Sequence, residues 1–207
     1  MRGKIGRRCA AAALAAALAI GFLGGAASAA TEERLVRLDA VLSRGGDPIY
    51  DAMAIGIWRM EGGKAVSRVA ERHAAPAEIA LVPGRYRIQA TYGNARRVTD
   101  ITVPAENAPS HTINLNAGKV RLQLLARANG PPVRDGVKWE IRRYRRGDSP
   151  GRPIAELGTD RPTLWLSEGW YEVRANHGGK QVDHVVEVNA GRTYDYAIVM
   201  GDADDRP

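Results

Sequence analysis

One sequence frame occurs twice in this chain of 207 residues. Residues 81–93 read LVPGRYRIQATYG and residues 166–178 read LSEGWYEVRANHG, so both share the pattern Leu-x-x-Gly-x-Tyr-x-(Ile/Val)-x-Ala-x-x-Gly. Upstream of the frame, residues 34–59 align with residues 118–143 at an offset of 84. A self-similarity of this length predicts tandem copies of one structural unit. The expected repeats span residues 30–117 and residues 118–200.

Within each repeat, apolar and polar residues alternate with a period of two. In YRIQATY (86–92), Tyr, Ile and Ala face one way while Arg, Gln and Thr face the other, as in a strand with one solvent-exposed face. Turn-forming pairs such as Gly-Gly and Pro-Gly separate the runs. Strands this short become stable only when two sheets bury their inner faces together. The sequence therefore predicts an all-β protein: two tandem immunoglobulin-like or prealbumin-like β-sandwiches after an N-terminal signal helix.

We expect six or seven strands in each repeat. In the first repeat they cover residues 35–42, 53–60, 65–70, 77–82, 85–92, 96–103 and 111–116. In the second repeat they cover residues 119–127, 137–144, 153–157, 162–166, 170–177, 181–188 and 193–200.

The duplicated frame itself is interpreted as a hairpin and its inner face. Gly84 and Gly169 occupy its tight turn, where a positive φ favours glycine. The tyrosine two positions later, Tyr86 or Tyr171, is expected to anchor the core with its ring. Its hydroxyl should then reach a backbone partner near the edge of the sandwich.

The frame follows a Gly-x-Pro-(Ile/Val)-x-Asp turn in each repeat, at residues 46–51 and 130–135. This combination resembles the carboxypeptidase regulatory-like and related transthyretin- or immunoglobulin-like domains of bacterial envelope proteins. The resemblance covers most of each repeat, and it lies in structural positions. It implies a β-sandwich fold, but that family is functionally diverse and mostly non-catalytic, so it implies little about a specific function.

The N-terminus has the three-part layout of a secretory signal peptide. MRGKIGRR is basic, the next stretch is apolar, and Ala27-Ser28-Ala29 offers small residues for cleavage after Ala29. We therefore expect a signal peptide over residues 1–29 and a periplasmic or secreted protein. An inner-membrane anchor stays open as an alternative, because the uncharged stretch from Cys9 to Ala30 is long enough to span a bilayer. The export route also stays open, since Arg7-Arg8 hints at a twin-arginine signal.

Charge and cysteine content limit the partners of the mature chain. The whole chain has a formal net charge of +7, but cleavage after Ala29 removes four basic residues and leaves 26 Lys and Arg against 23 Asp and Glu, or +3. A charge this small does not indicate a nucleic-acid partner. The only cysteine, Cys9, leaves with the signal peptide, so no disulfide or thiolate site is expected. Residues 201–207, GDADDRP, are expected to form an acidic flexible tail.

The motifs of catalysis and metal binding are missing from the sequence. The four histidines include no HExxH pair, and neither GxSxG nor a phosphate-binding glycine loop occurs. His177 replaces the inward Tyr92 of the first repeat, so we interpret it as a packing residue. The sequence therefore predicts a protein that is not an enzyme, with no cofactor, no metal and no catalytic residues. An enzyme with an unrecognised site has less support in the sequence than a binding module or a structural spacer, the two other functions described below.

The first candidate binding surface is the basic stretch IRRYRRGDSPGR at residues 141–152. A positive patch on an exported protein could meet an anionic membrane surface or an acidic partner. The competing interpretation is a solvated strand connection whose charges prevent edge-to-edge pairing. Its candidate residues are Arg142, Arg143, Tyr144, Arg145 and Arg146.

The second candidate surface is the pair Trp165 and Trp170 in LWLSEGWYEV. The alternation points both indoles outward, and we expect them on adjacent strands across a short turn. Two neighbouring indoles could stack on a sugar ring or on a partner side chain. Alternatively, they pack against the other repeat, since tandem sandwiches need an interface.

Together these features predict an exported, non-catalytic binding module of the bacterial cell envelope. Its partner would be an envelope glycan or protein, recognised through the second repeat. The alternative function is a structural spacer or an assembly subunit of an envelope complex. Ligand identity and oligomeric state do not follow from the sequence.

Overall fold

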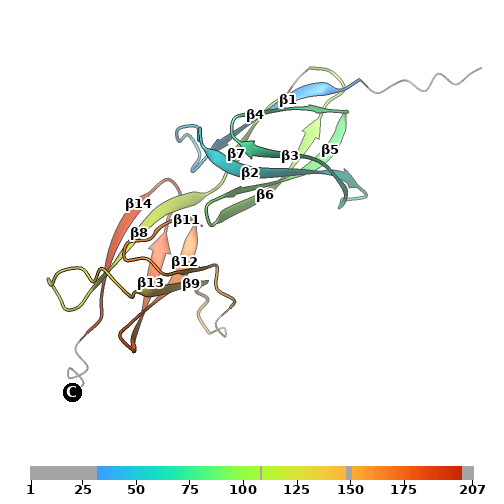
Figure 1. The fold of residues 1–207 in the computed structure, drawn as a ribbon. Coiled ribbons are helices and arrows are strands. Elements are labelled where there is room, and N and C mark those ends of the chain that lie inside the picture. The colour runs from blue at the N-terminus through green and yellow to red at the C-terminus, as the bar shows by residue number, and fades with distance from the viewer. Residues whose placement is uncertain (1–31, 108, 148–150, 202–207) are drawn as a thin grey trace, which may run out of the picture. The chain divides into compact units, whose positions relative to one another are not determined.

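The structure, a computed structural model, describes residues 32–107, 109–147 and 151–201. These residues form fourteen β-strands and no helix (Figure 1), which confirms the all-β prediction. The signal helix predicted for residues 1–29 and residues 202–207 of the predicted tail lie outside the described residues.

Each repeat contributes seven strands, close to the limits expected from the alternation. The first repeat contains β1 (Arg34–Val41), β2 (Ala52–Glu61), β3 (Lys64–Ala74), β4 (Ala77–Leu81), β5 (Gly84–Tyr92), β6 (Ala95–Val103) and β7 (Ser110–Asn114). The second contains β8 (Ala117–Leu125), β9 (Lys138–Arg143), β10 (Ala155–Leu157), β11 (Thr163–Ser167), β12 (Gly169–His177), β13 (Lys180–Val188) and β14 (Thr193–Val199).

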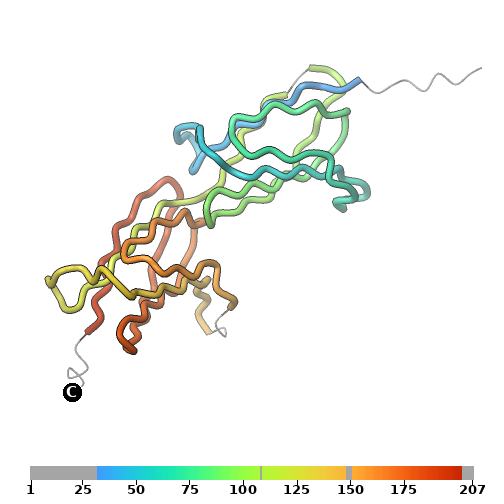
Figure 2. The backbone as a smooth tube through the Cα atoms, in the orientation of Figure 1, coloured from blue at the N-terminus to red at the C-terminus, as the bar shows by residue number. Residues whose placement is uncertain are grey.

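Both repeats have the same sheet topology. In the first repeat one sheet has the order β4-β1-β7 and the other the order β3-β2-β5-β6; the second repeat has β11-β8-β14 and β10-β9-β12-β13. The first and last strands of each repeat pair in parallel, β1 with β7 and β8 with β14, and every other described pairing is antiparallel. The backbone trace shows the two layers of each repeat (Figure 2). The prediction of two tandem β-sandwiches is confirmed.

Each sandwich buries its own apolar core between its two sheets. In β5, the inward residues Tyr86, Ile88 and Ala90 are at most 1% exposed, while the residues between them contact solvent. Tyr171, Val173 and Ala175 repeat this pattern in β12. The strict alternation fixes the register, because a slip by one residue would turn every apolar side chain to the outside.

The duplicated frame is a crossing between sheets and not a hairpin. β4 pairs with β1, whereas β5 pairs with β2 and β6, so the chain passes from one layer to the other between them. The hairpin interpretation was therefore wrong. The turn signal in the sequence locates the reversal correctly, but it does not say whether the two strands hydrogen-bond or face each other across the core.

The glycine and the tyrosine of the frame act as expected. Gly84 has a φ of 156° and Gly169 has a φ of 142°. Residues with a side chain rarely adopt these positive φ values, so glycine is favoured at both positions. The Tyr86 hydroxyl donates to the carbonyl of Val82 at 2.7 Å, and the Tyr171 hydroxyl donates to the carbonyl of Ser167. Each tyrosine thus fills the core and holds the crossing turn that precedes it.

The described residues include neither a membrane-spanning helix nor a metal-binding cluster. No helix among them has the length and apolar character to cross a membrane. Nor does this part of the chain contain three His, Cys, Asp or Glu side chains grouped to hold a metal ion.

Candidate binding surfaces

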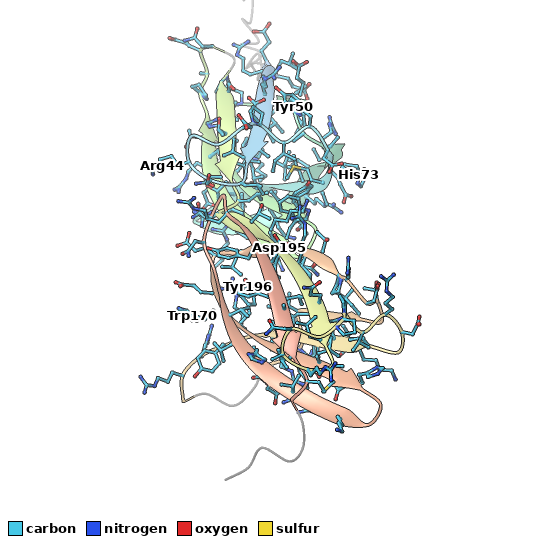
Figure 3. All side chains as sticks on the ribbon, turned by 90° about the vertical axis from the view of Figure 1, so that its left-hand side faces the viewer. Arg44, Tyr50, His73, Trp170, Asp195 and Tyr196 are labelled. Atoms are coloured by element: carbon cyan, nitrogen blue, oxygen red, sulfur yellow. The ribbon has the colours of Figure 1, made fainter. Side chains whose placement is uncertain are left out.

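The outer face of the β9–β12–β13 layer carries an exposed cluster of aromatic, apolar and basic side chains. Trp170 in β12 is 50% exposed and Val185 in β13 is 46% exposed, and Figure 3 shows Trp170 projecting from the ribbon. With Tyr144 and Arg146 they line an open depression of about 590 Å³. We call these four residues the Trp170 cluster.

The backbone explains why the Trp170 cluster forms. The amide of Tyr144 donates to the carbonyl of Trp170 at 2.9 Å, which extends the β9–β12 pairing by one residue. Tyr144, the first residue after β9, is therefore held beside the start of β12. The sequence analysis treated the basic stretch and the tryptophan pair as separate surfaces. In the structure one depression is lined by Trp170 of the pair and by Tyr144 and Arg146 of the basic stretch.

Arg142 is neutralised by its neighbours on the same outer face. It forms an ion pair with Glu140, and it lies directly opposite Glu172 in the β9–β12 register. Beside this pair, Arg174 binds Glu172 at 3.2 Å and Asp183 at 2.7 Å. Two arginines thus meet three carboxylates, so this part of the face has no excess of positive charge.

The pKa values of this network move in the direction that ion pairing requires. The hydrogen bond from Arg174 lowers the pKa of Asp183, and the same bond raises the pKa of Arg174. Both groups therefore stay charged and paired under ordinary conditions.

Arg143 has a structural role at the crossing turn. Its guanidinium carbon lies 4.9 Å from the centre of the Tyr171 ring, and its Nη1 donates to the carbonyl of Glu168 at 3.0 Å. Burial raises the pKa of the Tyr171 hydroxyl, and the nearby Arg143 charge opposes that rise. Of the predicted basic residues, Arg145 and Arg146 are the exposed ones beyond the end of β9.

Trp165 does not join Trp170. β11 and β12 belong to different sheets, so their outward side chains leave opposite faces of the sandwich. The expectation of two neighbouring indoles was wrong for the same reason as the hairpin interpretation. Trp165 is half-buried, and its ring lies 5.0 Å from the ring of Tyr92 in the first repeat, with the Lys119 ammonium 5.1 Å from its centre.

The contacts of Trp165 are therefore those of packing between repeats. A Cβ atom at Gly93 would lie 2.9 Å from the indole Cδ1, so the β5–β6 turn lies directly against the ring. Next to it, the Ser167 hydroxyl accepts a hydrogen bond from the amide of Arg96 at 3.2 Å. The tryptophans were expected either to bind a partner or to pack against the other repeat. Trp165 packs against the first repeat, whereas Trp170 is exposed to solvent.

The sequence analysis missed two surfaces of the first repeat. On the outer face of β2, the six-membered ring of Trp58 covers Gly56, where any Cβ would overlap it, and the Arg68 guanidinium lies 5.6 Å from the ring centre. The glycine two positions before the tryptophan was the available signal. The second surface is a groove of about 1190 Å³ along β1 and β7, with Arg37, Asp39, Thr112 and Asn114 among its polar lining residues.

Comparisons with known proteins assign no family to this chain. No family model matches, and no curated protein matches. Among solved structures, the chain is similar to the TIE protein of Bacillus anthracis (12% identity, TM-score 0.34), with 81% of this chain and 34% of that chain covered. It therefore spans about a third of the length of that protein.

Two further solved structures are similar over most of their own length. The minor pilin of Streptococcus agalactiae shows 13% identity and a TM-score of 0.38 over 79% of this chain and 94% of that chain. A candidate adhesin from Bacteroides ovatus shows 10% identity and a TM-score of 0.39 over 75% and 76%. The likeness concerns the fold alone. The protein belongs by its architecture to the class of tandem β-sandwich proteins.

Proposed function

We propose that this protein is an exported, non-catalytic binding module of the bacterial cell envelope, and that the Trp170 cluster holds its glycan or protein partner. The observation that carries the proposal is the half-exposed Trp170, set beside Tyr144, Val185 and Arg146 around one depression. The signal peptide expected over residues 1–29, and membership of the carboxypeptidase regulatory-like domains, belong to the same proposal.

The chemistry of the Trp170 cluster suits partners that combine an apolar face with polar edges. An indole ring stacks on the C–H face of a sugar or on an aliphatic side chain, and it loses exposed apolar surface when it does so. The Tyr144 hydroxyl and the Arg146 guanidinium can donate hydrogen bonds at the rim. A cluster of this composition is typical of the central residues of protein interfaces.

The test replaces Trp170 by Ala and measures co-sedimentation with isolated cell envelopes. We expect association to fall by about tenfold or more, since central aromatic residues contribute most to binding. The midpoint of thermal unfolding should stay unchanged, because the side chain is half-exposed. Trp58→Ala on the corresponding face of the first repeat is the matched control and should bind normally.

Protease treatment of the envelopes separates a protein partner from a glycan partner, since only the former is destroyed. Unchanged sedimentation of Trp170→Ala would refute the proposal. So would a loss of binding that follows a loss of folded protein.

A contact with an anionic membrane surface is a narrower part of the proposal. It concerns Arg145 and Arg146, the exposed arginines of the basic stretch beyond the end of β9. Reversing both charges to Glu should reduce binding to vesicles containing phosphatidylglycerol at low salt, and the effect should fade as salt screens it. Equal binding of both proteins at low salt would exclude this contact.

A second candidate function is a spacer or assembly subunit, and the contacts of Trp165 favour it. The ring packs on Tyr92 and Gly93, and only Leu115 and Asn116 separate β7 from β8. Such contacts would limit movement between the repeats. If this function holds, Trp165→Ala should impair assembly in the envelope while Trp170→Ala has no effect.

A further inference from the structure

A wide depression lies mainly in the first repeat, away from the Trp170 cluster, and Ala190 of the second repeat borders it. It is the groove of about 1190 Å³ on the outer face of β1 and β7, which we call the β1–β7 groove. Its polar lining includes Arg37, Asp39, Arg44, Tyr50, Arg97 and Asn114.

The parallel strand pair forms the floor of the groove. Asp39 lies opposite Thr112 in the register, and Val41 lies opposite Asn114, so their outward side chains stand in two adjacent rows. The Asn114 side-chain oxygen accepts a hydrogen bond from the amide of Asn116 at 3.0 Å, which fixes its orientation. The floor thus presents hydroxyl and amide groups in a set arrangement.

The loop after β1 folds back and forms one wall. The amide of Ile49 donates to the carbonyl of Ala40 at 2.8 Å, and Ile49 itself is buried at 8% exposure. This anchor leaves the next side chain, Tyr50, 74% exposed. Figure 3 shows Tyr50 and Arg44 on the first repeat, both directed toward solvent.

The lining has an excess of positive charge. Arg37, Arg44 and Arg97 contribute three cations, and among the described lining residues Asp39 is the only carboxylate. Asp39 accepts from the Nε of Arg37 at 3.2 Å, and this bond raises the pKa of Arg37. Asp39 is therefore paired with Arg37 within the groove. The three arginines and this one carboxylate give the lining a net charge of +2, which a negatively charged ligand can meet.

We propose that the β1–β7 groove binds an acidic glycan. A saccharide needs closely spaced donors and acceptors for its hydroxyl groups, and Thr112 and Asn114 supply both. Its carboxylate or phosphate groups suit guanidinium groups, which bind such anions in bidentate geometry. The exposed ring of Tyr50 offers a surface for the C–H face of one sugar. An apolar partner would find little to bind here, because the lining is predominantly polar.

The second repeat shows that the fold alone does not create this groove. At the offset of 84, Tyr50 corresponds to Arg134, Arg44 to Ala128, and Asp39 to Gln123. The corresponding face of β8 carries an ion pair between Arg121 and Asp195 at 3.3 Å and a depression of about 230 Å³. The wide groove, its aromatic wall and its two additional arginines are thus particular to the first repeat.

The test uses polygalacturonate and its fully methyl-esterified form, which have the same sugar ring with and without the charge. Affinity electrophoresis of the full chain should show binding to polygalacturonate, and binding to the ester should be about tenfold weaker or more. Tyr50→Ala and Arg44→Ala should each weaken binding to polygalacturonate by about tenfold. Arg134→Ala, at the position equivalent to Tyr50, should have no effect.

Each contrary outcome overturns a stated part of the inference. Absence of binding to polygalacturonate, or equal binding to the ester, would refute recognition of an acidic glycan. Unchanged affinity of both Tyr50→Ala and Arg44→Ala would exclude the groove. Displacement by inorganic phosphate alone at low concentration would show that the groove reads charge without the sugar.

The outcome is independent of the function proposed for the second repeat. Trp170→Ala should leave polygalacturonate binding unchanged. If this variant abolished it instead, the glycan would bind the Trp170 cluster, and the inference would fail while the proposed function stood. Since Tyr50 and Arg44 are exposed on a loop, both variants should fold, and circular dichroism with an unfolding curve checks this.

Discussion

The two repeats share one interior and differ on their outer faces. Tyr86 and Tyr171 are each 1% exposed and make the same hydrogen bond to the crossing turn. One residue earlier, the outward Arg85 of the first repeat corresponds to Trp170 of the second. The inner positions must fill a closed space between two sheets, whereas the outer positions meet only solvent or a partner. Duplication has therefore kept the core and left the surfaces free to specialise.

The specialised surfaces lie on different layers. In the second repeat the exposed aromatic cluster lies on the four-stranded layer, around Trp170. In the first repeat the wide polar groove lies on the three-stranded layer, along β1 and β7. If both proposals hold, one chain carries two unlike binding surfaces on one repeated architecture.

The strongest test of the shared interior is the loss of either frame tyrosine. Tyr86→Ala and Tyr171→Ala should each lower the free energy of unfolding of the repeat concerned by about 3–5 kcal/mol, because each ring fills a closed core. The Phe variants should cost only about 1 kcal/mol, for the hydroxyl bond to the turn. Chemical denaturation followed by circular dichroism measures both. Clearly unequal losses in the two repeats would break the comparison.

An intermediate effect should separate the two tryptophans of the second repeat. Trp165→Ala should lower the free energy of unfolding by about 1–2 kcal/mol, since the half-buried ring loses its packing on Tyr92. Trp170→Ala should change it by less than about 0.5 kcal/mol, as is usual at exposed positions. Thermal and denaturant unfolding of both variants check this. Equal losses would mean that Trp170 also packs against protein.

The smallest effect concerns the ion pairs Arg87–Asp100 and Arg174–Asp183, one on the outer face of each repeat. Bonds from the arginines lower the pKa of both Asp100 and Asp183. A lowered folded-state pKa gives stability that is present above the unfolded pKa of about 3.9 and is lost as the pH falls through the folded value. Because Asp183 contacts solvent, screening keeps its contribution below about 1 kcal/mol.

The corresponding measurement compares Asp183→Asn with the parent protein across pH. The parent should be slightly more stable near neutral pH, and the difference should shrink below about pH 4, where the carboxylate becomes protonated. Asp100→Asn should behave alike in the first repeat. A difference that grows at low pH would contradict the pairing.

The sequence predicted the features that depend on local periodicity. Alternation located the fourteen strands of the described residues, and the repeated frame identified Tyr86 and Tyr171 as core residues. These predictions succeeded because the period of two and the glycine turns act over a few residues.

What the sequence did not predict depends on which strands are neighbours. The run around Arg142 looked basic, because its partners Glu140 and Glu172 are recognised only once the β9–β12 register is known. Trp165 and Trp170 looked adjacent, because the turn between them gives no sign that it crosses between sheets. The groove beside Tyr50 was missed because five strands separate β1 from β7 in the sequence, so nothing local indicates that the two strands pair.

The parallel pairing of first and last strands has a mechanical consequence. When two strands run parallel, a pull on the start of one and the end of the other slides them lengthwise, so all their hydrogen bonds resist together. β1 and β7 share five register pairs, whereas β8 and β14 share seven. Under tension along the chain, as at a surface exposed to flow, the second sandwich should therefore rupture at higher force than the first.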